Sequence, residues 1–175
     1  MRNIIIALLV LPLLAILQST LLPYFSWYAV FKVNLVLVTV LSWNLVYPHT
    51  EGVLWALIGG LMMDSLSGSH MGTSIIALCI ASLIANWAGS HAWSSNIILQ
   101  LFTSISGNII YYLIYLLLLA TTGWSADWTS IPINHLLPST IINALATILI
   151  LPIVRWLSSN TTRQNTTRQG VGYIK

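Results

Sequence analysis

The stretch EGVLWALIGGLMMDSLSGSHMG, residues 51–72, decides how this sequence folds. It is mostly apolar, yet it carries five glycines and two of the three acidic residues of the chain. Along it a glycine, alanine or aspartate stands at every fourth position: Gly52, Ala56, Gly60, Asp64, Gly68 and Gly72, with Gly59 beside them. Four residues turn an α-helix by about 400°, so these positions stay close to one edge. We predict a helix with a smooth edge that another helix can approach closely.

The composition places this helix in a membrane. Of the 175 residues, 57% are hydrophobic and 5% are charged, and the mean hydropathy is +0.87. Soluble domains are about one quarter charged, and a chain of this length could not bury so much apolar surface in water. The net charge of +3 is not gathered on a polar face interleaved with aromatic residues, so nucleic acid is not an expected partner.

Six apolar segments are long enough, or nearly long enough, to cross a bilayer. A hydrocarbon core of about 30 Å needs roughly 20 helical residues, and fewer where flanking side chains reach the interface. The segments cover residues 4–22, 33–47, 52–66, 73–89, 97–122 and 136–157. The second and third are joined by PHTE, so we expect a helical hairpin. The sequence therefore predicts an all-α integral membrane domain over residues 1–157 with six transmembrane helices.

The C-terminal segment, residues 158–175, has a different character. It contains the tandem repeat NTTRQNTTRQ and no apolar periodicity, so we predict a disordered tail. An even number of spans puts both termini on one side of the membrane. Five of the six basic residues then lie on that side, at Arg2, Arg155, Arg163, Arg168 and Lys175. The positive-inside rule predicts that both termini, including the tail, are cytoplasmic.

Several polar side chains stand inside the apolar segments: Gln18, Ser19, Asn34, Asn44, Asn86, Gln100, Asn108 and Asn143. Hydrocarbon offers no hydrogen-bond partner, so these side chains are expected to face the interior of the bundle. They either join helices to one another or line a pocket, and the sequence leaves both open. Asp64 is the costliest of the polar groups in the apolar segments, and we expect water or the backbone N–H groups of the following SLSG turn to satisfy it.

No arrangement of residues predicts catalysis or metal binding. Glu51 and Asp64 are 13 residues apart on one predicted helix, about 20 Å, which is too far for an acid–base pair. The four histidines alternate between the two predicted ends of the bundle, so neither side collects enough ligands for a metal. The chain is therefore predicted not to be an enzyme and to need no cofactor.

Two motifs in order resemble the MreD family of rod shape-determining proteins of the bacterial inner membrane. LQSTLLP, residues 17–23, carries Gln18 and Ser19 and is similar to a signature late in the first helix of that family. The second motif is the pattern of glycines around Asp64 in residues 51–72. Where that family often has Pro-Asp at the start of the second helix, this chain has Val33 and Asn34.

The resemblance implies a fold and a set of partners. The fold is expected to be similar to that of the substrate-binding subunits of energy-coupling factor transporters. The function is expected to be that of a membrane scaffold in the cell-elongation complex that makes side-wall peptidoglycan. Its partners would be the bitopic protein MreC and, indirectly, the transglycosylase RodA, a class B penicillin-binding protein and MreB filaments, with membrane lipid around it.

Two other functions stay open. The chain could be the small-molecule-binding or lipid-binding subunit of a transporter. Such subunits commonly carry an A-x-x-x-A motif in the first helix, whereas Ala7 and Ala15 stand eight residues apart. Under the scaffold hypothesis, the smooth edge formed by the glycines, Ala56 and Asp64 is expected to be the seam where a partner helix packs, and Gln18, Ser19, Asn34, Asn44 and Asn108 are expected to lie in the interior or a pocket.

Overall fold

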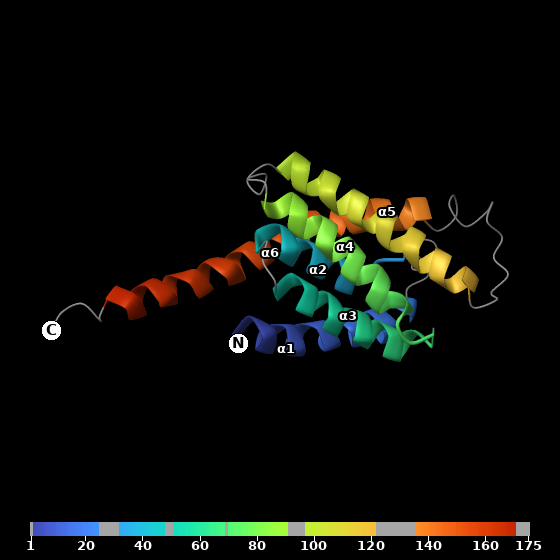
Figure 1. The fold of residues 1–175 in the computed structure, drawn as a ribbon, viewed down its shortest axis with the longest axis horizontal. Helices are drawn as coiled ribbons and strands as arrows, with labels where there is room; N and C mark the ends of the chain where they lie inside the picture. Colours follow the sequence, from blue (N-terminus) through green and yellow to red (C-terminus); the bar gives the residue numbers. More distant parts are fainter. Residues whose placement is uncertain are drawn as a thin grey trace.

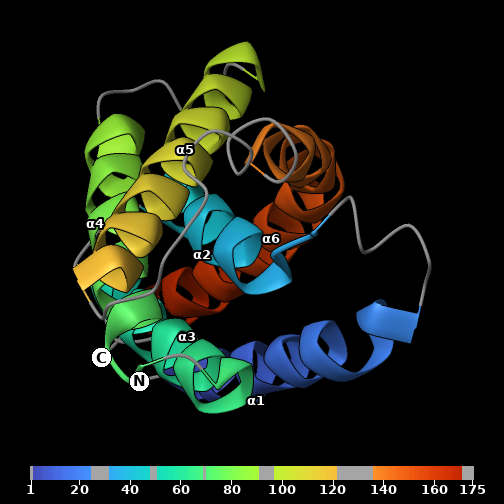
Figure 2. The same cartoon turned by 90° about the vertical axis from the view of Figure 1, so that its right-hand side faces the viewer.

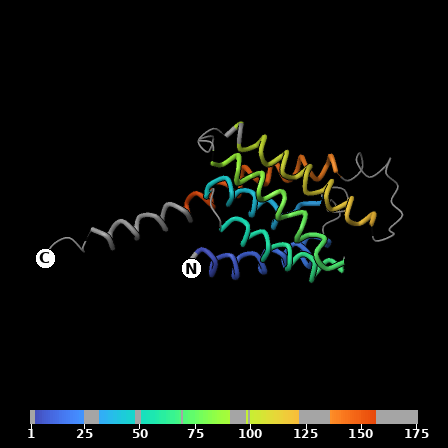
Figure 3. Tube along the Cα trace, in the orientation of Figure 1, coloured from blue at the N-terminus to red at the C-terminus, as the bar shows by residue number. Residues whose placement is uncertain are grey.

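The computed structural model describes residues 2–24, 32–47, 51–68, 70–90, 97–121 and 136–170, and within these ranges it is entirely helical apart from short turns and extended residues (Figures 1 and 3). The helices in chain order are α1 (Arg2–Ile16), α2 (Leu35–Val46), α3 (Glu51–Ser67), α4 (Thr73–Ser90), α5 (Ile97–Thr121) and α6 (Leu137–Gly170). Between α1 and α2 the chain forms a π-helical turn, η1 (Leu17–Leu21), and a 3-10 turn, η2 (Leu22–Tyr24). The predicted all-α class with six helical segments is confirmed.

The helix ends agree with the predicted segments to within two residues, except at the ends of α1 and α6. The helix α1 ends six residues before the predicted end, and η1 and η2 continue the first segment to Tyr24. The structure continues α6 to Gly170, so residues 158–170, which the sequence predicts as a disordered tail, are part of this helix. In the PHTE link, we expect Pro48 to end the second segment and Thr50 or Glu51 to begin the third; α3 begins at Glu51. Pro48 and Thr50 lie outside the described residues, as does the tail beyond residue 170. The division into a membrane domain and a tail stays a prediction.

Four helical stretches in the described part of the chain are long and apolar enough to cross a membrane. They are Asn3–Tyr24, Thr73–Ser90, Gln100–Thr121 and Leu137–Trp156. The helix α2 is apolar but has 12 residues, and α3 has 17. At 1.5 Å per residue these two rise about 18 and 26 Å, less than the hydrocarbon thickness. A six-span topology therefore remains a prediction for α2 and α3.

The short helix α2 forms the centre of the bundle. It packs against α1, α3, α4, α5 and α6, and Figure 2 shows it enclosed by α3, α4, α5 and α6. All ten residues from Val36 to Leu45 are buried. A helix that is apolar around its whole circumference can lie in a protein core or in lipid, and here the five neighbouring helices place α2 in the core. The outer helices carry the exposed apolar side chains, such as Leu9 at 69% and Leu149 at 71% exposed.

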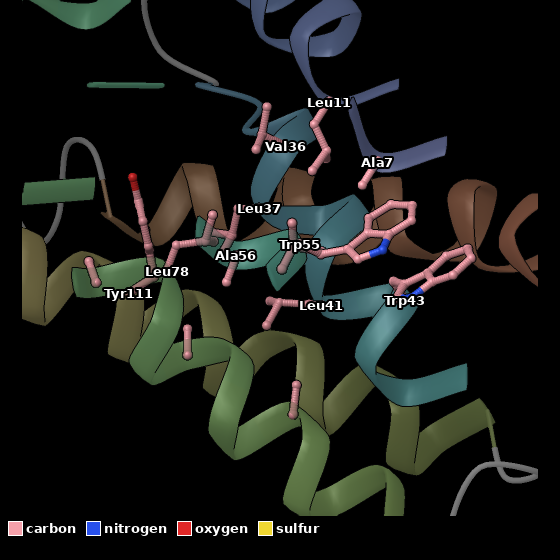
Figure 4. Close-up of a cluster of buried hydrophobic side chains, with 14 of the residues drawn as sticks. Ala7, Leu11, Val36, Leu37, Leu41, Trp43, Trp55, Ala56, Leu78 and Tyr111 are labelled. Atoms are coloured by element: carbon pink, nitrogen blue, oxygen red, sulfur yellow. The ribbon is translucent and has the colours of Figure 1, made fainter. Parts of the chain in front are cut away.

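The buried core follows the length of α2 (Figure 4). At one end Trp43 of α2 stacks on Trp55 of α3, with ring centroids 4.0 Å apart and planes 12° from parallel. Both indoles are 1% exposed. Stacked aromatic pairs add about 0.5–1.5 kcal/mol to the stabilisation that comes from burying their surface, so this pair helps to fix α3 on α2.

The smooth edge of α3 brings neighbouring helices into close contact. A Cβ added to Gly60 would lie 2.5 Å from the Cα of Ile75 in α4, and one added to Gly59 would lie 2.8 Å from Val36 Cγ1 and 3.2 Å from Leu78 Cδ2. One added to Gly52 would overlap the side chain of Asn44. The predicted close approach is therefore realised, and the helices that approach are α2 and α4 of the same chain.

The last two glycines of the predicted edge belong to a turn instead. The helix α3 ends at Ser67, and Gly68 and Gly72 have φ angles of +65° and +101° with nothing within 4 Å of an added Cβ. Side-chain-bearing residues rarely adopt such angles, so these two glycines let the chain reverse between α3 and α4. The predicted seam is thus a helix edge from Gly52 to Asp64 followed by a turn.

The close packing at Gly60 gives a test. Gly60→Ala places a methyl group against backbone, which cannot move without separating α3 from α4, and overpacking of this kind costs about 1–3 kcal/mol. The matched control is Gly107→Ala in α5, whose added Cβ would meet Leu41 side-chain atoms at 2.9–3.0 Å that can shift. Both variants replace glycine by alanine inside a helix, so the higher helix propensity of alanine stabilises both by about 1 kcal/mol. Thermal unfolding in detergent should show Gly60→Ala clearly less stable than Gly107→Ala; equal stability would contradict the packing.

Candidate functional site

A network of buried amide side chains surrounds the first turn of α2. The backbone N–H of Asn34 donates to Asn143 Oδ1 of α6 at 2.8 Å, and Asn143 Nδ2 donates to Asn108 Oδ1 of α5 at 2.8 Å. Asn108 Nδ2 in turn donates to the carbonyl oxygen of Ser104 at 2.9 Å. Asn108 and Asn143 are fully buried, and Asn34 is 4% exposed. The network therefore joins three helices at a depth where water is absent.

Two further side-chain oxygens accept hydrogen bonds from the same turn of α2. Asn34 Oδ1 accepts a hydrogen bond from the backbone N–H of Leu37 at 3.0 Å, which makes Asn34 the N-cap residue. Gln18 Oε1, from the π-helical turn η1, accepts from the N–H of Val36 at 3.4 Å. The first N–H groups of a helix have no partner within it and must be satisfied from outside. A carboxylate at residue 34 could accept the same bond, so asparagine caps the helix without a charge.

A hydroxyl pair next to the amides was not predicted. Ser104 Oγ and Thr147 Oγ1 lie 2.6 Å apart, and Thr147 Oγ1 also donates to the carbonyl oxygen of Asn143 at 2.8 Å. Both residues are buried. Ser104 precedes Asn108 by four residues, and Asn143 precedes Thr147 by four. Polar residues four apart share a helix face, so this spacing is the signal that could have found the pair.

Asp64 caps the start of α4. Its Oδ2 accepts from the N–H of Gly72 at 2.7 Å and of Ile75 at 3.4 Å, and its Oδ1 accepts from the N–H of Ser74 at 2.8 Å. The side chain is 3% exposed. The helix dipole of α4 also favours a negative charge at this end. We expected capping by the SLSG turn; the structure supplies donors from Gly72 and α4 instead.

Gln18 and Ser19 also line a groove on the outer surface of the bundle. This α1–α3 groove has a volume of about 190 Å³ and is lined by Ala15, Gln18, Ser19, Pro23, Met63, Leu66 and Ser67. Ser19 is exposed, and its hydroxyl donates to the carbonyl oxygen of Ile16 at 3.2 Å. A π-helical turn widens the helix and often marks a functional position, here where the QS pair stands.

The structure separates the predicted site residues into four groups, of which Gly68 and Gly72 form the turn between α3 and α4. Gly52, Ala56, Gly59, Gly60, Asn44 and Asp64 are buried and hold α3 against α2 and α4. Asn34 and Asn108 belong to the amide network. Gln18 reaches both the network and the groove, and Ser19 lies in the groove. Within the chain, α2 and α4 pack against the edge at Gly52, Gly59 and Gly60, and the use of this edge by a partner helix stays a prediction.

The chemistry of these residues is structural. Their groups are amides, hydroxyls and one carboxylate held by three backbone N–H groups. Among the described residues, no cluster of three or more histidine, cysteine, aspartate or glutamate side chains could hold a metal ion. Glu51, at the start of α3, accepts a hydrogen bond from Asn3 Nδ2 at 2.6 Å and lies at the opposite end of the helix from Asp64.

The comparisons with known proteins agree with the motifs. The family model of the rod shape-determining protein MreD matches residues 1–160. No solved structure matches the chain.

The cap on α4 gives a second test. Asp64→Ala leaves the N–H groups of Gly72 and Ser74 without an acceptor in a buried place, which costs about 1–3 kcal/mol. Asp64→Asn keeps one acceptor oxygen and should lose less. Thermal unfolding in detergent should therefore rank wild type above Asp64→Asn, and Asp64→Asn above Asp64→Ala. The control is Ser65→Ala, an exposed neighbour whose loss should change little; an Asp64→Ala variant as stable as this control would refute the cap.

Proposed function

This chain belongs to the MreD family of rod shape-determining proteins, and we propose that it acts as a non-enzymatic membrane scaffold in the cell-elongation complex. Family membership implies a bacterial membrane protein with a role in cell shape. The proposal adds that the chain binds an MreC-like bitopic protein and, through it, the RodA and class B penicillin-binding protein synthase and MreB filaments. It also places both termini in the cytoplasm.

The family match over residues 1–160 carries this proposal. The packing of the bundle supports it, because the polar residues that resemble family motifs are used to hold helices together. The interior around α2 is filled by the chain's own side chains, which favours a scaffold over a small-molecule-binding subunit. The likeness to transporter subunits remains an expectation from the resemblance.

The α1–α3 groove is the surface that we propose for the MreC-like partner. Gly52, Gly59 and Gly60 of the glycine edge pack against α2 and α4, which favours the groove over this edge. The helix α1 lies at the margin of the bundle in Figure 2, and in its membrane-spanning stretch 17% of the residues are buried, the smallest share among the four. Gln18 and Ser19 bring the family-like motif to this margin.

Affinity purification from native membranes tests the function and the surface together. The wild-type chain should recover cell-wall synthesis proteins; recovery of an ATPase module instead would favour the transporter alternative. Ser19→Trp fills the groove from an exposed position and should reduce recovery of the partner several-fold. The control Leu117→Trp, at a 64% exposed position on α5, should not. Equal recovery by both variants would count against the groove, while the wild-type result still decides the function.

A further inference from the structure

A second groove lies between α5 and α6 on the opposite part of the bundle. This α5–α6 groove has a volume of about 130 Å³ and is lined by Gln100, Leu101, Thr147, Ile148, Leu151, Pro152 and Arg155. Gln100, Thr147 and Leu151 form its buried base, whereas Ile148, Pro152 and Arg155 are exposed at its rim. The groove thus combines a mostly apolar wall with one cationic side chain, and the scaffold function uses neither.

The position of Arg155 sets the depth of the groove in the membrane. The apolar stretch of α6 is Leu137–Trp156, so Arg155 is its second-to-last residue. The neighbouring Trp156 is 66% exposed, as expected for an aromatic residue at the membrane interface. The end of an apolar span is expected to lie near the lipid phosphates, and a guanidinium can donate two parallel hydrogen bonds to a phosphate.

Pro152 removes the usual helix donor from one carbonyl of a residue that lines the groove. Proline has no N–H, so the carbonyl of Ile148, four residues earlier, lacks its usual helix donor. Both residues line the groove. A headgroup that carries hydroxyl groups can donate to such a carbonyl while its phosphate meets Arg155.

The apolar flank of the groove suits an acyl chain. Ile148, Leu149 and Ile153 are 42%, 71% and 62% exposed on α6. A volume of about 130 Å³ holds a fragment of a lipid, so the remainder would lie along this flank. The combination of a cation at phosphate depth and an apolar wall leading into the bilayer matches one class of molecule.

We propose that the α5–α6 groove is a binding site for an anionic phospholipid, whose phosphate is held by Arg155 and whose acyl chain lies along Ile148, Leu149 and Ile153. Basic pockets between transmembrane helices bind anionic headgroups by the same physics. The site does not depend on the scaffold function or on its partner, and it can be tested on the purified protein.

Native mass spectrometry of the detergent-purified protein measures this binding with added dioleoyl phosphatidylglycerol or dioleoyl phosphatidylcholine. The wild-type protein should bind phosphatidylglycerol about five-fold more tightly, the factor expected from one cation near a membrane surface. Arg155→Gln should abolish this preference, and Arg155→Lys should keep part of it. Equal affinity of the wild-type protein for the two lipids would overturn the proposal.

Two further variants distinguish a specific lipid site from a general attraction between anionic lipid and the positive charges of the protein. Lys32→Gln removes the same charge from an exposed residue just before α2, near the Asn143 end of α6, and should leave the preference unchanged. Equal losses in Lys32→Gln and Arg155→Gln would overturn the proposal. Ile148→Trp fills the groove but keeps Arg155, and it should weaken phosphatidylglycerol binding at least as much as Arg155→Lys. Binding by Ile148→Trp that equals wild-type binding would also overturn the proposal. So would a photo-crosslinker at residue 148 that, in native membranes, reacts with protein rather than with lipid.

Discussion

The structure depends on satisfying the N-terminus of a helix that is buried among other helices. The helix α2 begins inside the bundle, where its first N–H groups cannot reach water, and each unsatisfied group there costs several kcal/mol. The N–H groups of Asn34, Val36 and Leu37 find acceptors on Asn143, Gln18 and Asn34. These acceptors come from α6, from η1 and from the cap residue itself. Because Asn108 holds Asn143, α5 joins the same arrangement. Four parts of the chain are therefore fixed around one helix end.

The junction of α3 and α4 solves a related problem with a charge. Small residues from Gly52 to Gly60 bring α3 close to α2 and α4, and this approach buries the first turn of α4. Asp64 supplies the acceptors that this turn needs, and the glycines with positive φ at residues 68 and 72 allow the reversal that brings them together. The acidic residue is thus retained in an apolar helix because the geometry of the turn gives it three donors. Because α2 and α4 pack against this edge, the α1–α3 groove on the outer surface is the place that we propose for a partner.

The sequence predicted much of the architecture because apolar length and glycine spacing are local signals. Six segments, the smooth edge around Gly60 and a capping role for Asp64 follow from residues near one another in the chain. The identity of the neighbours does not, because Gly60 meets Ile75 and Gln18 meets Val36 through tertiary packing that no local pattern encodes. The central place of α2 was also missed: a short apolar helix looks the same whether lipid or protein surrounds it. Ser104 and Thr147 escaped notice since single hydroxyls are common in membrane helices.

Hydrogen–deuterium exchange of the protein in nanodiscs, read by mass spectrometry on peptides that cover α2, can show whether Asn143 secures the start of α2. Asn143→Leu keeps the approximate size of the side chain and removes the acceptor for the Asn34 N–H. The account predicts that this change in α6 accelerates exchange at residues 34–38 of the distant α2 segment, while exchange over α3 stays near its wild-type rate. Acceleration confined to α6, with no change at the start of α2, would contradict it.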